Sequence, residues 1–91
     1  MKNQKDFNKI ISNNIFFKKR KYALIIGETP SRGARSPKLW NRIYKKYKDH
    51  TKMFPADVSI QNLKKLMCYL KFDNLFIGSA VTAPYKEKIL R

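Results

Sequence analysis

The sequence predicts an α/β fold, in which a small, open and mostly parallel sheet is flanked by helices. Three observations support this class. The run from Tyr22 to Gly27 is continuously apolar, as in a strand buried on both faces of a parallel sheet. Two stretches with helical periodicity follow it, and each precedes another strand-like stretch. The order β-α-β-α-β, followed by the start of a further helix, implies crossover connections between parallel strands.

The first predicted helix of the sheet domain begins at Ser36 and runs to about Lys48. Residues 28–35, rich in turn-forming residues, are the loop before it. Ser36 is the expected N-cap, and Pro37 the expected first helical residue, where a missing N–H costs nothing. An apolar stripe should pack this helix on the sheet; it consists of Leu39, Trp40, Ile43, Tyr44 and Tyr47.

The second half repeats the pattern. A short strand is expected from Lys52 to Val58, with Pro55 favouring an edge or a bulge. A helix capped by Ser59 should then run from about Ile60 to Leu70. Its expected buried stripe is Leu63, Leu66, Met67 and Leu70. We expect Cys68 in the same helix to be a buried thiol, and residues 75–81 to be a third, buried strand.

Residues 1–21 form a basic N-terminal extension. Apolar residues spaced by three and four predict an amphipathic helix from about Lys5 to Lys18. The sequence leaves three roles open for this extension: it packs on the domain, it contacts a partner, or it is loosely ordered.

Composition limits the function classes. A chain of 91 residues allows one small domain. Its single cysteine excludes an intramolecular disulfide and a structural zinc site, and its single histidine, His50, lies in a polar loop, so no metal site is expected. No stretch approaches the roughly 18 apolar residues that span a bilayer, and the N-terminus is a poor secretory signal. We therefore expect a cytoplasmic protein without a membrane segment.

Two segments at strand-to-helix junctions carry the chemistry. One runs from Gly27 to Asn41, directly after the first strand, and the other from Gly78 to Ile89, at the end of the third. Small-molecule ligands of open α/β sheets bind at the carboxyl ends of the strands. Thr82 is placed to cap a helix or to face a ligand.

Together these segments resemble the N-terminal, substrate-binding domain of the shikimate dehydrogenase family. The family pattern is G-x-P-x-x-H-S-x-S-P-x-x-H-N, followed by N-V-T-x-P-x-K. The first motif is matched by Gly27, Pro30, Ser36, Pro37 and Asn41, and the second by Val81, Thr82, Pro84 and Lys86. Ser36 and Lys86 are 50 positions apart, which fits the family's spacing. The resemblance covers residues 22–91, so a domain truncated at its C-terminus is expected there.

The resemblance implies an NADP-dependent oxidoreductase that acts on a hydroxylated cyclic carboxylic acid, as shikimate dehydrogenase does on the chorismate pathway to aromatic amino acids. By resemblance, Lys86 is the catalytic base that takes the hydroxyl proton, and the positive end of a helix would favour its neutral amine. Thr82 would hold a ring hydroxyl, Ser36 a carboxylate, and Asn41 would brace the loop. The alternative, purely structural roles are helix caps for Ser36 and Thr82 and a solvent-facing side chain for Lys86.

The chain also departs from the family. Ala34 and Ala80 replace a serine and an asparagine, and Gly33 and Trp40 replace two histidines. Arg35, together with Arg32, could compensate by pairing with the substrate carboxylate. These changes favour a related but different hydroxy acid, or a degraded site. NADP is implied, but no G-x-G-x-x-G occurs in the chain. We expect the cofactor domain to belong to a longer enzyme or to a partner chain, and this chain alone not to catalyse the reaction.

Charge supports an alternative of another class, a small basic module that binds nucleic acid or an acidic partner. Lysines and arginines number 21 against 6 acids, for a net charge of +15. The basic segment 18–21 and the aromatic residues Tyr44 and Tyr47 would contribute contacts. A bias of composition explains the charge equally well, and this alternative ranks second because it does not account for the two motifs.

Overall fold

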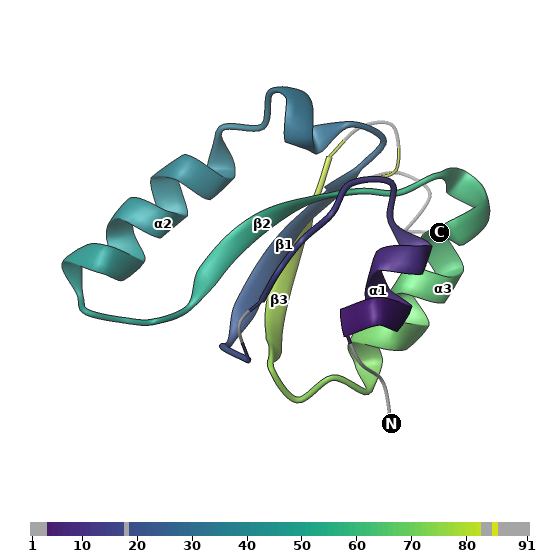
Figure 1. The fold of residues 1–91 in the computed structure, drawn as a ribbon. Coiled ribbons are helices and arrows are strands. Elements are labelled where there is room, and N and C mark those ends of the chain that lie inside the picture. The colour runs from purple at the N-terminus through teal and green to yellow at the C-terminus, as the bar shows by residue number, and fades with distance from the viewer. Residues whose placement is uncertain (1–3, 18, 83–84, 86–91) are drawn as a thin grey trace.

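The protein is an α/β domain built on three parallel strands. The computed structural model describes residues 4–17, 19–82 and 85, with residues 4–6 as backbone only. The strands β1 (Tyr22–Gly27), β2 (Lys52–Asp57) and β3 (Phe76–Val81) form one sheet in the order β2-β1-β3 (Figure 1). The helices are α1 (Gln4–Ile10), α2 (Ser36–Lys46) and α3 (Ile60–Lys71), with a 3-10 turn, η1, at Pro30–Arg32. The predicted fold class is confirmed.

The central strand β1 holds the sheet together. All six of its residues are buried, as its continuous apolar run predicted. It pairs in parallel with β2 on one side, with Ile26 opposite Ala56, and with β3 on the other, with Ile26 opposite Val81. Pro55 lies in β2, an edge strand of this sheet, which confirms its predicted position.

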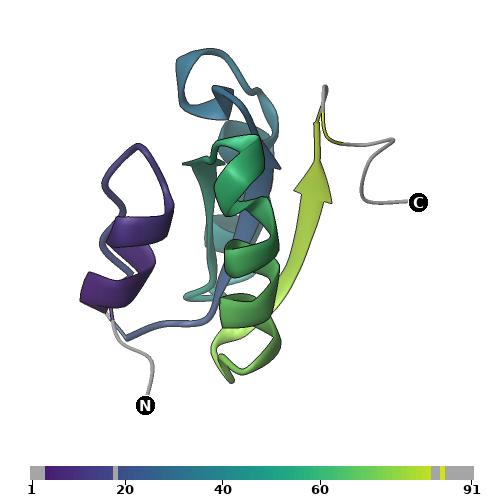
Figure 2. The ribbon, with the colours of Figure 1, turned by 90° about the vertical axis from the view of Figure 1, so that its right-hand side faces the viewer.

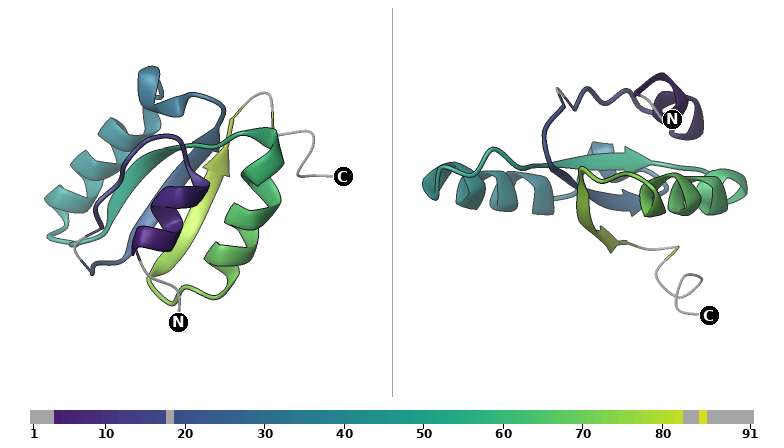
Figure 3. Two further views of the ribbon diagram at one scale, coloured as in Figure 1. Left: turned by 45° about the vertical axis from the view of Figure 1, so that its right-hand side comes forward. Right: turned by 90° about the horizontal axis from the view of Figure 1, so that it is seen from below.

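The helices form a layer on each face of the sheet. Figures 1 and 2 show α2 on one face and both α1 and α3 on the other. Figure 3 shows that α1 lies toward the β2 edge, at the opposite side of the molecule from β3. The face covered by α1 and α3 holds the main core, whereas α2 lies mainly over β2.

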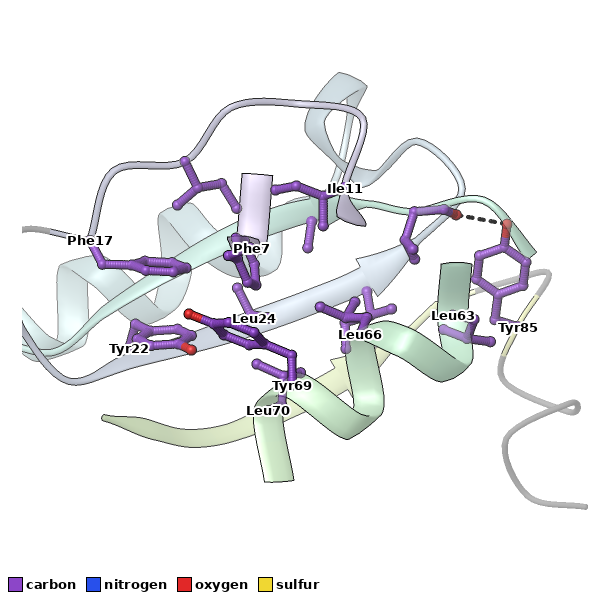
Figure 4. Close-up of a cluster of buried hydrophobic side chains, with 14 residues drawn as sticks. Phe7, Ile11, Phe17, Tyr22, Leu24, Leu63, Leu66, Tyr69, Leu70 and Tyr85 are labelled. Atoms are coloured by element: carbon purple, nitrogen blue, oxygen red, sulfur yellow. Dashed lines mark hydrogen bonds between the residues drawn. The ribbon is translucent and has the colours of Figure 1, made fainter. Parts of the chain in front are cut away.

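Aromatic rings fill the centre of that core (Figure 4). Phe17 stacks on Tyr22 with ring centroids 3.8 Å apart, and Phe7 meets Phe17 edge-on at 4.9 Å. Tyr69 of α3 closes the cluster against Phe7 at 5.3 Å. Offset and edge-on contacts of this kind add to the free energy gained from burial alone.

The described part of the N-terminal extension packs on the domain, which is the first of the three roles left open. Its apolar side chains Phe7, Ile11, Ile15 and Phe17 are buried in the core. The predicted helix to Lys18 is wrong, because α1 ends at Ile10. The chain then follows the outer edge of β2, where the Asn13 side chain bonds the backbone of Pro55 (2.8 Å) and Asp57 (2.7 Å). Short polar side chains compete with helix by bonding backbone groups in this way.

Four further expectations are corrected by the structure. The stripe on α2 is not buried: no residue of α2 is, and Trp40 is 46% exposed. Arg35 occupies the N-cap position, which makes Ser36 the first helical residue, and α2 stops at Lys46 rather than Lys48. Cys68 is exposed, because it lies on the outer side of α3. β3 is only half-buried, because no described helix covers its face on the α2 side.

The helix α3 agrees with its prediction. It follows Ser59 at the N-cap position, although no side-chain capping bond is made there. Leu63, Leu66 and Leu70 are buried, and Met67 packs half-buried against them. None of the helices in the described part of the chain is long and apolar enough to cross a membrane.

Candidate functional site

The carboxyl ends of β1 and β3 create an opening at one edge of the sheet. From β1 the chain crosses to β2 on one side, and from β2 it crosses back to β3 on the other. The strand order therefore reverses between β1 and β3, which makes the carboxyl ends of this strand pair a topological switch point. In open α/β sheets, ligands bind in the crevice at such a point.

A cleft of about 560 Å³ lies at this edge, within the size range of small-molecule sites. It is lined by Glu28, Thr29, Pro30, Arg32, Gly33, Ala34 and Thr82. Thr82 comes from the second motif segment and all the others from the first. The Thr82 N–H donates to the Ile26 carbonyl at 2.8 Å, which extends the β1–β3 ladder and sets Thr82 beside the loop after β1.

The loop after β1 is held in place by Asp57, at the end of β2. The Ser31 N–H donates to Asp57 Oδ1 at 2.8 Å, and the Ser31 hydroxyl donates to Oδ2 of the same carboxylate. Asp57 is only 8% exposed, and Pro30 of the loop is also buried. Hydrogen bonds to an ionised acceptor are the stronger kind. Asp57 and Ser31 therefore act as positioning residues for the cleft.

Sequence analysis did not single out Asp57 or Ser31. The available signal was an acidic residue, one of six in the chain, at the end of a strand of mostly apolar residues. Its partner is 26 positions away, and no local pattern links residues at that distance.

The chemistry of the cleft suits a small ligand that carries a carboxylate and hydroxyl groups. Among the described residues that line it, Arg32 is the one cation and Glu28 the one acid, and Arg32 can pair with a carboxylate. The hydroxyls of Thr29 and Thr82 can each donate and accept hydrogen bonds. Ala34 adds an apolar surface at a position where the family pattern has serine.

Tyr85 anchors the chain just after Thr82. Its N–H donates to the Thr82 carbonyl at 3.1 Å, and its buried hydroxyl donates to the Val58 carbonyl at 2.8 Å. Burial raises the pKa of the Tyr85 hydroxyl, and the Glu28 carboxylate raises it further. Tyr85 is thus kept neutral as a hydrogen-bond donor, and it fixes the path of the chain as it leaves the cleft.

The structure brings only part of the predicted site together. Thr82 lines the cleft. Arg35 is exposed ahead of α2 and Ser36 is half-buried in its first turn, and neither lines the cleft. Asn41 braces α2 to β2 rather than to the loop: its side chain bonds the Met53 N–H (2.7 Å) and carbonyl (3.0 Å). Lys86 lies outside the described residues.

Comparison of the chain with protein-family models, characterised proteins and solved structures finds no significant match. The resemblance to shikimate dehydrogenases therefore depends on the two motifs themselves. Among the residues that the structure describes, no three His, Cys, Asp or Glu side chains gather where they could hold a metal ion.

Proposed function

We propose that this chain is the substrate-binding half of a shikimate dehydrogenase-like, NADP-dependent oxidoreductase of the cytoplasm. Its substrate would be a hydroxylated cyclic carboxylic acid held at the carboxyl edge of the sheet. Arg32 would pair with the carboxylate, and Thr82 would hold a ring hydroxyl.

One observation carries the proposal. The two motif segments, which begin 51 positions apart at Gly27 and Gly78, meet in one cleft at the switch point of the sheet. The fold alone gives a reason for a ligand to bind there, and it is independent of the motifs. Two separate arguments therefore support the same place on the molecule.

The cofactor would be bound outside this chain. The last residue of β1 and the loop from there to α2 contain only Gly27 and Gly33, so this segment is not the glycine-rich turn that cradles a dinucleotide. A separate NADP-binding domain would then supply hydride transfer, and Lys86 is the proposed acceptor of the substrate's hydroxyl proton. Arg35 and Ser36 would add contacts to the carboxylate only if the loop closed over the ligand.

The test is an NMR titration of the full chain with shikimate and with quinate at moderate salt. Saturable shifts at Thr82, Thr29 and Arg32 are expected with one of the two acids. Thr82→Val, which removes the hydroxyl at nearly constant volume, should weaken binding about tenfold. The matched control is Ser79→Ala, an exposed residue of β3 that does not line the cleft, and it should leave the affinity unchanged.

A second variant tests whether restoring the serine hydroxyl of the family pattern, in place of Ala34, strengthens binding. Ala34→Ser returns the hydroxyl of the family pattern to the cleft wall and should strengthen binding several-fold. Shifts confined to other surfaces, or equal affinities for Thr82→Val and the unchanged chain, would show that this cleft does not bind the acid.

A further inference from the structure

A second cleft lies at the opposite edge of the sheet, where β1 and β2 begin and α2 ends. Its volume is about 600 Å³. The described residues that line it are Arg20, Asn41, Tyr44, Lys45, Lys48, Asp49, His50, Thr51 and Lys52. Three separate segments contribute, since Arg20 precedes β1, Asn41 to Lys45 belong to α2, and the others form the loop from α2 into β2.

The charge of this cleft is strongly positive. Among the described residues that line it, four are lysine or arginine and Asp49 is the one acid. Asp49 is moreover engaged locally, because its carboxylate accepts the Thr51 N–H at 2.8 Å. This bond lowers the pKa of the Asp49 carboxyl, with smaller contributions from Lys21 and His50. One carboxylate cannot neutralise four cations, so the cleft attracts anions.

Hydrogen bonds fix the backbone at the end of α2, from which two of the lysines project. At the end of α2 the Lys48 N–H donates to the Lys45 carbonyl (3.1 Å), and the Asp49 N–H donates to the Tyr44 carbonyl (2.8 Å). These two bonds form a Schellman motif. They satisfy carbonyls that would otherwise present the negative end of the helix to an incoming anion.

Left-handed backbone marks the same edge. Lys48 has φ of 56° and Lys19, beside Arg20, has φ of 52°; among the described residues these are the two non-glycine residues with positive φ. At Lys48 this is the conformation that the C′ position of a Schellman motif adopts, usually with glycine, and lysine there adds a positive charge to the lining of the cleft.

Tyr44 gives the cleft an aromatic surface. It is half-buried in α2, and its ring lies 6.0 Å from that of Trp40. A cationic groove that contains a fixed aromatic ring is the combination by which proteins bind single strands, since bases stack on the ring while lysines contact the phosphates.

We propose that this basic cleft binds the phosphodiester backbone of a single-stranded nucleic acid, with Lys45, Lys48 and Arg20 on phosphates and Tyr44 against a base. The basic cleft lies at the opposite edge of the sheet from the cleft beside the carboxyl ends of β1 and β3, so neither proposal depends on the other. Nucleic-acid binding would also account for the net charge of +15, which the proposed hydroxy-acid site does not explain.

The test is fluorescence anisotropy with a labelled single-stranded oligonucleotide of about 10 nucleotides. The double variant Lys45→Gln/Lys48→Gln removes two charges from the cleft. Lys64→Gln/Lys65→Gln removes two equally exposed charges from α3, outside the cleft, and is the matched control. We expect the cleft variant to bind at least tenfold more weakly, with a salt slope smaller by about 1.4, and the control to change less than twofold.

Two outcomes would overturn the proposal. Equal weakening by both double variants would mean that the oligonucleotide senses net charge alone. Competition by inorganic tripolyphosphate as effective as that by unlabelled oligonucleotide would mean that the cleft holds phosphate without a base. Circular dichroism spectra of the two variants check that both remain folded, and the acid titration of the other cleft is read separately in the same samples.

Discussion

Tyr22 is the largest fully buried side chain in the described part of the chain, and it carries a polar group into the core. Its ring stacks on Phe17, while its hydroxyl donates to Asp73 Oδ2 at 2.5 Å. Asp73 follows α3, so this bond ties the start of β1 to the turn that leads into β3. Burial raises the pKa of Tyr22, and the bond to Asp73 raises it further.

Tyr22→Phe should lower the free energy of unfolding by about 1–2 kcal/mol at pH 8, because the half-buried Asp73 carboxylate loses a donor. The deficit should shrink as the pH rises above about 10. There the unfolded chain of the unchanged protein releases the Tyr22 proton while the folded state retains it, so the unchanged protein loses stability through this group and the variant does not. Urea unfolding at pH 8 and at about pH 11 measures both effects.

The control for this pH effect is Tyr47→Phe, since Tyr47 is 73% exposed. Tyr47→Phe should change the free energy of unfolding little at either pH. A Tyr22→Phe deficit that stays constant up to pH 11 would show that Tyr22 ionises in the folded protein as easily as in the unfolded chain.

Among the elements, α2 shows what an amphipathic pattern can and cannot predict. The spacing of Leu39, Ile43 and Tyr47 correctly indicates a helix with an apolar face. The pattern does not say what covers that face. In a sheet of three strands α2 lies over the β2 edge, and the side chains of Leu39, Ile43 and Tyr47 remain 43–73% exposed.

The elements that sequence predicted best are those whose neighbours are dictated by topology. Once the order β-α-β-α-β is known, it fixes what the central strand β1 and the buried stripe of α3 pack against. The end of α1 and the hydrogen bonds from Ser31 to Asp57 depend on contacts between residues 26 or more positions apart. No local sequence pattern encodes such contacts. For the same reason Thr82 could be placed from sequence at the cleft beside the carboxyl ends of β1 and β3, whereas the positions of Ser36 and Asn41 away from that cleft could not.

The exposed face of α2 predicts an unequal response to the same kind of substitution. Ile43→Ala should change the free energy of unfolding by less than about 1 kcal/mol, because Ile43 is 43% exposed and alanine favours helix. Leu66→Ala on α3 should cost about 2–5 kcal/mol, because Leu66 is fully buried and truncation leaves a cavity. Urea unfolding of the two variants measures the difference. Equal costs would mean that the α2 face is covered in solution by another molecule.

For the molecule as a whole, residues 4–17 are part of the fold rather than an appendage. A domain of this size buries a modest share of its surface and has little stability to spare. Four of the 14 residues in the core cluster come from this segment, and it also occupies the outer edge of β2. A sheet edge that lacks such a cover is prone to pair with other chains.

The resemblance places a domain at residues 22–91, but the packing predicts that this fragment does not fold alone. Removal of residues 1–21 would uncover Tyr22, Leu24 and Tyr69 and should abolish dispersed NMR signals and near-ultraviolet circular dichroism. Phe7→Ala in the full chain tests the same packing without removing the segment. It should lower the free energy of unfolding by about 3–5 kcal/mol, because the ring is fully buried. Phe16→Ala is the matched control and should cost less than about 1 kcal/mol, because Phe16 is 67% exposed. A fragment 22–91 with the stability of the full chain, or equal losses for the two phenylalanine variants, would show that the N-terminal segment does not complete the core.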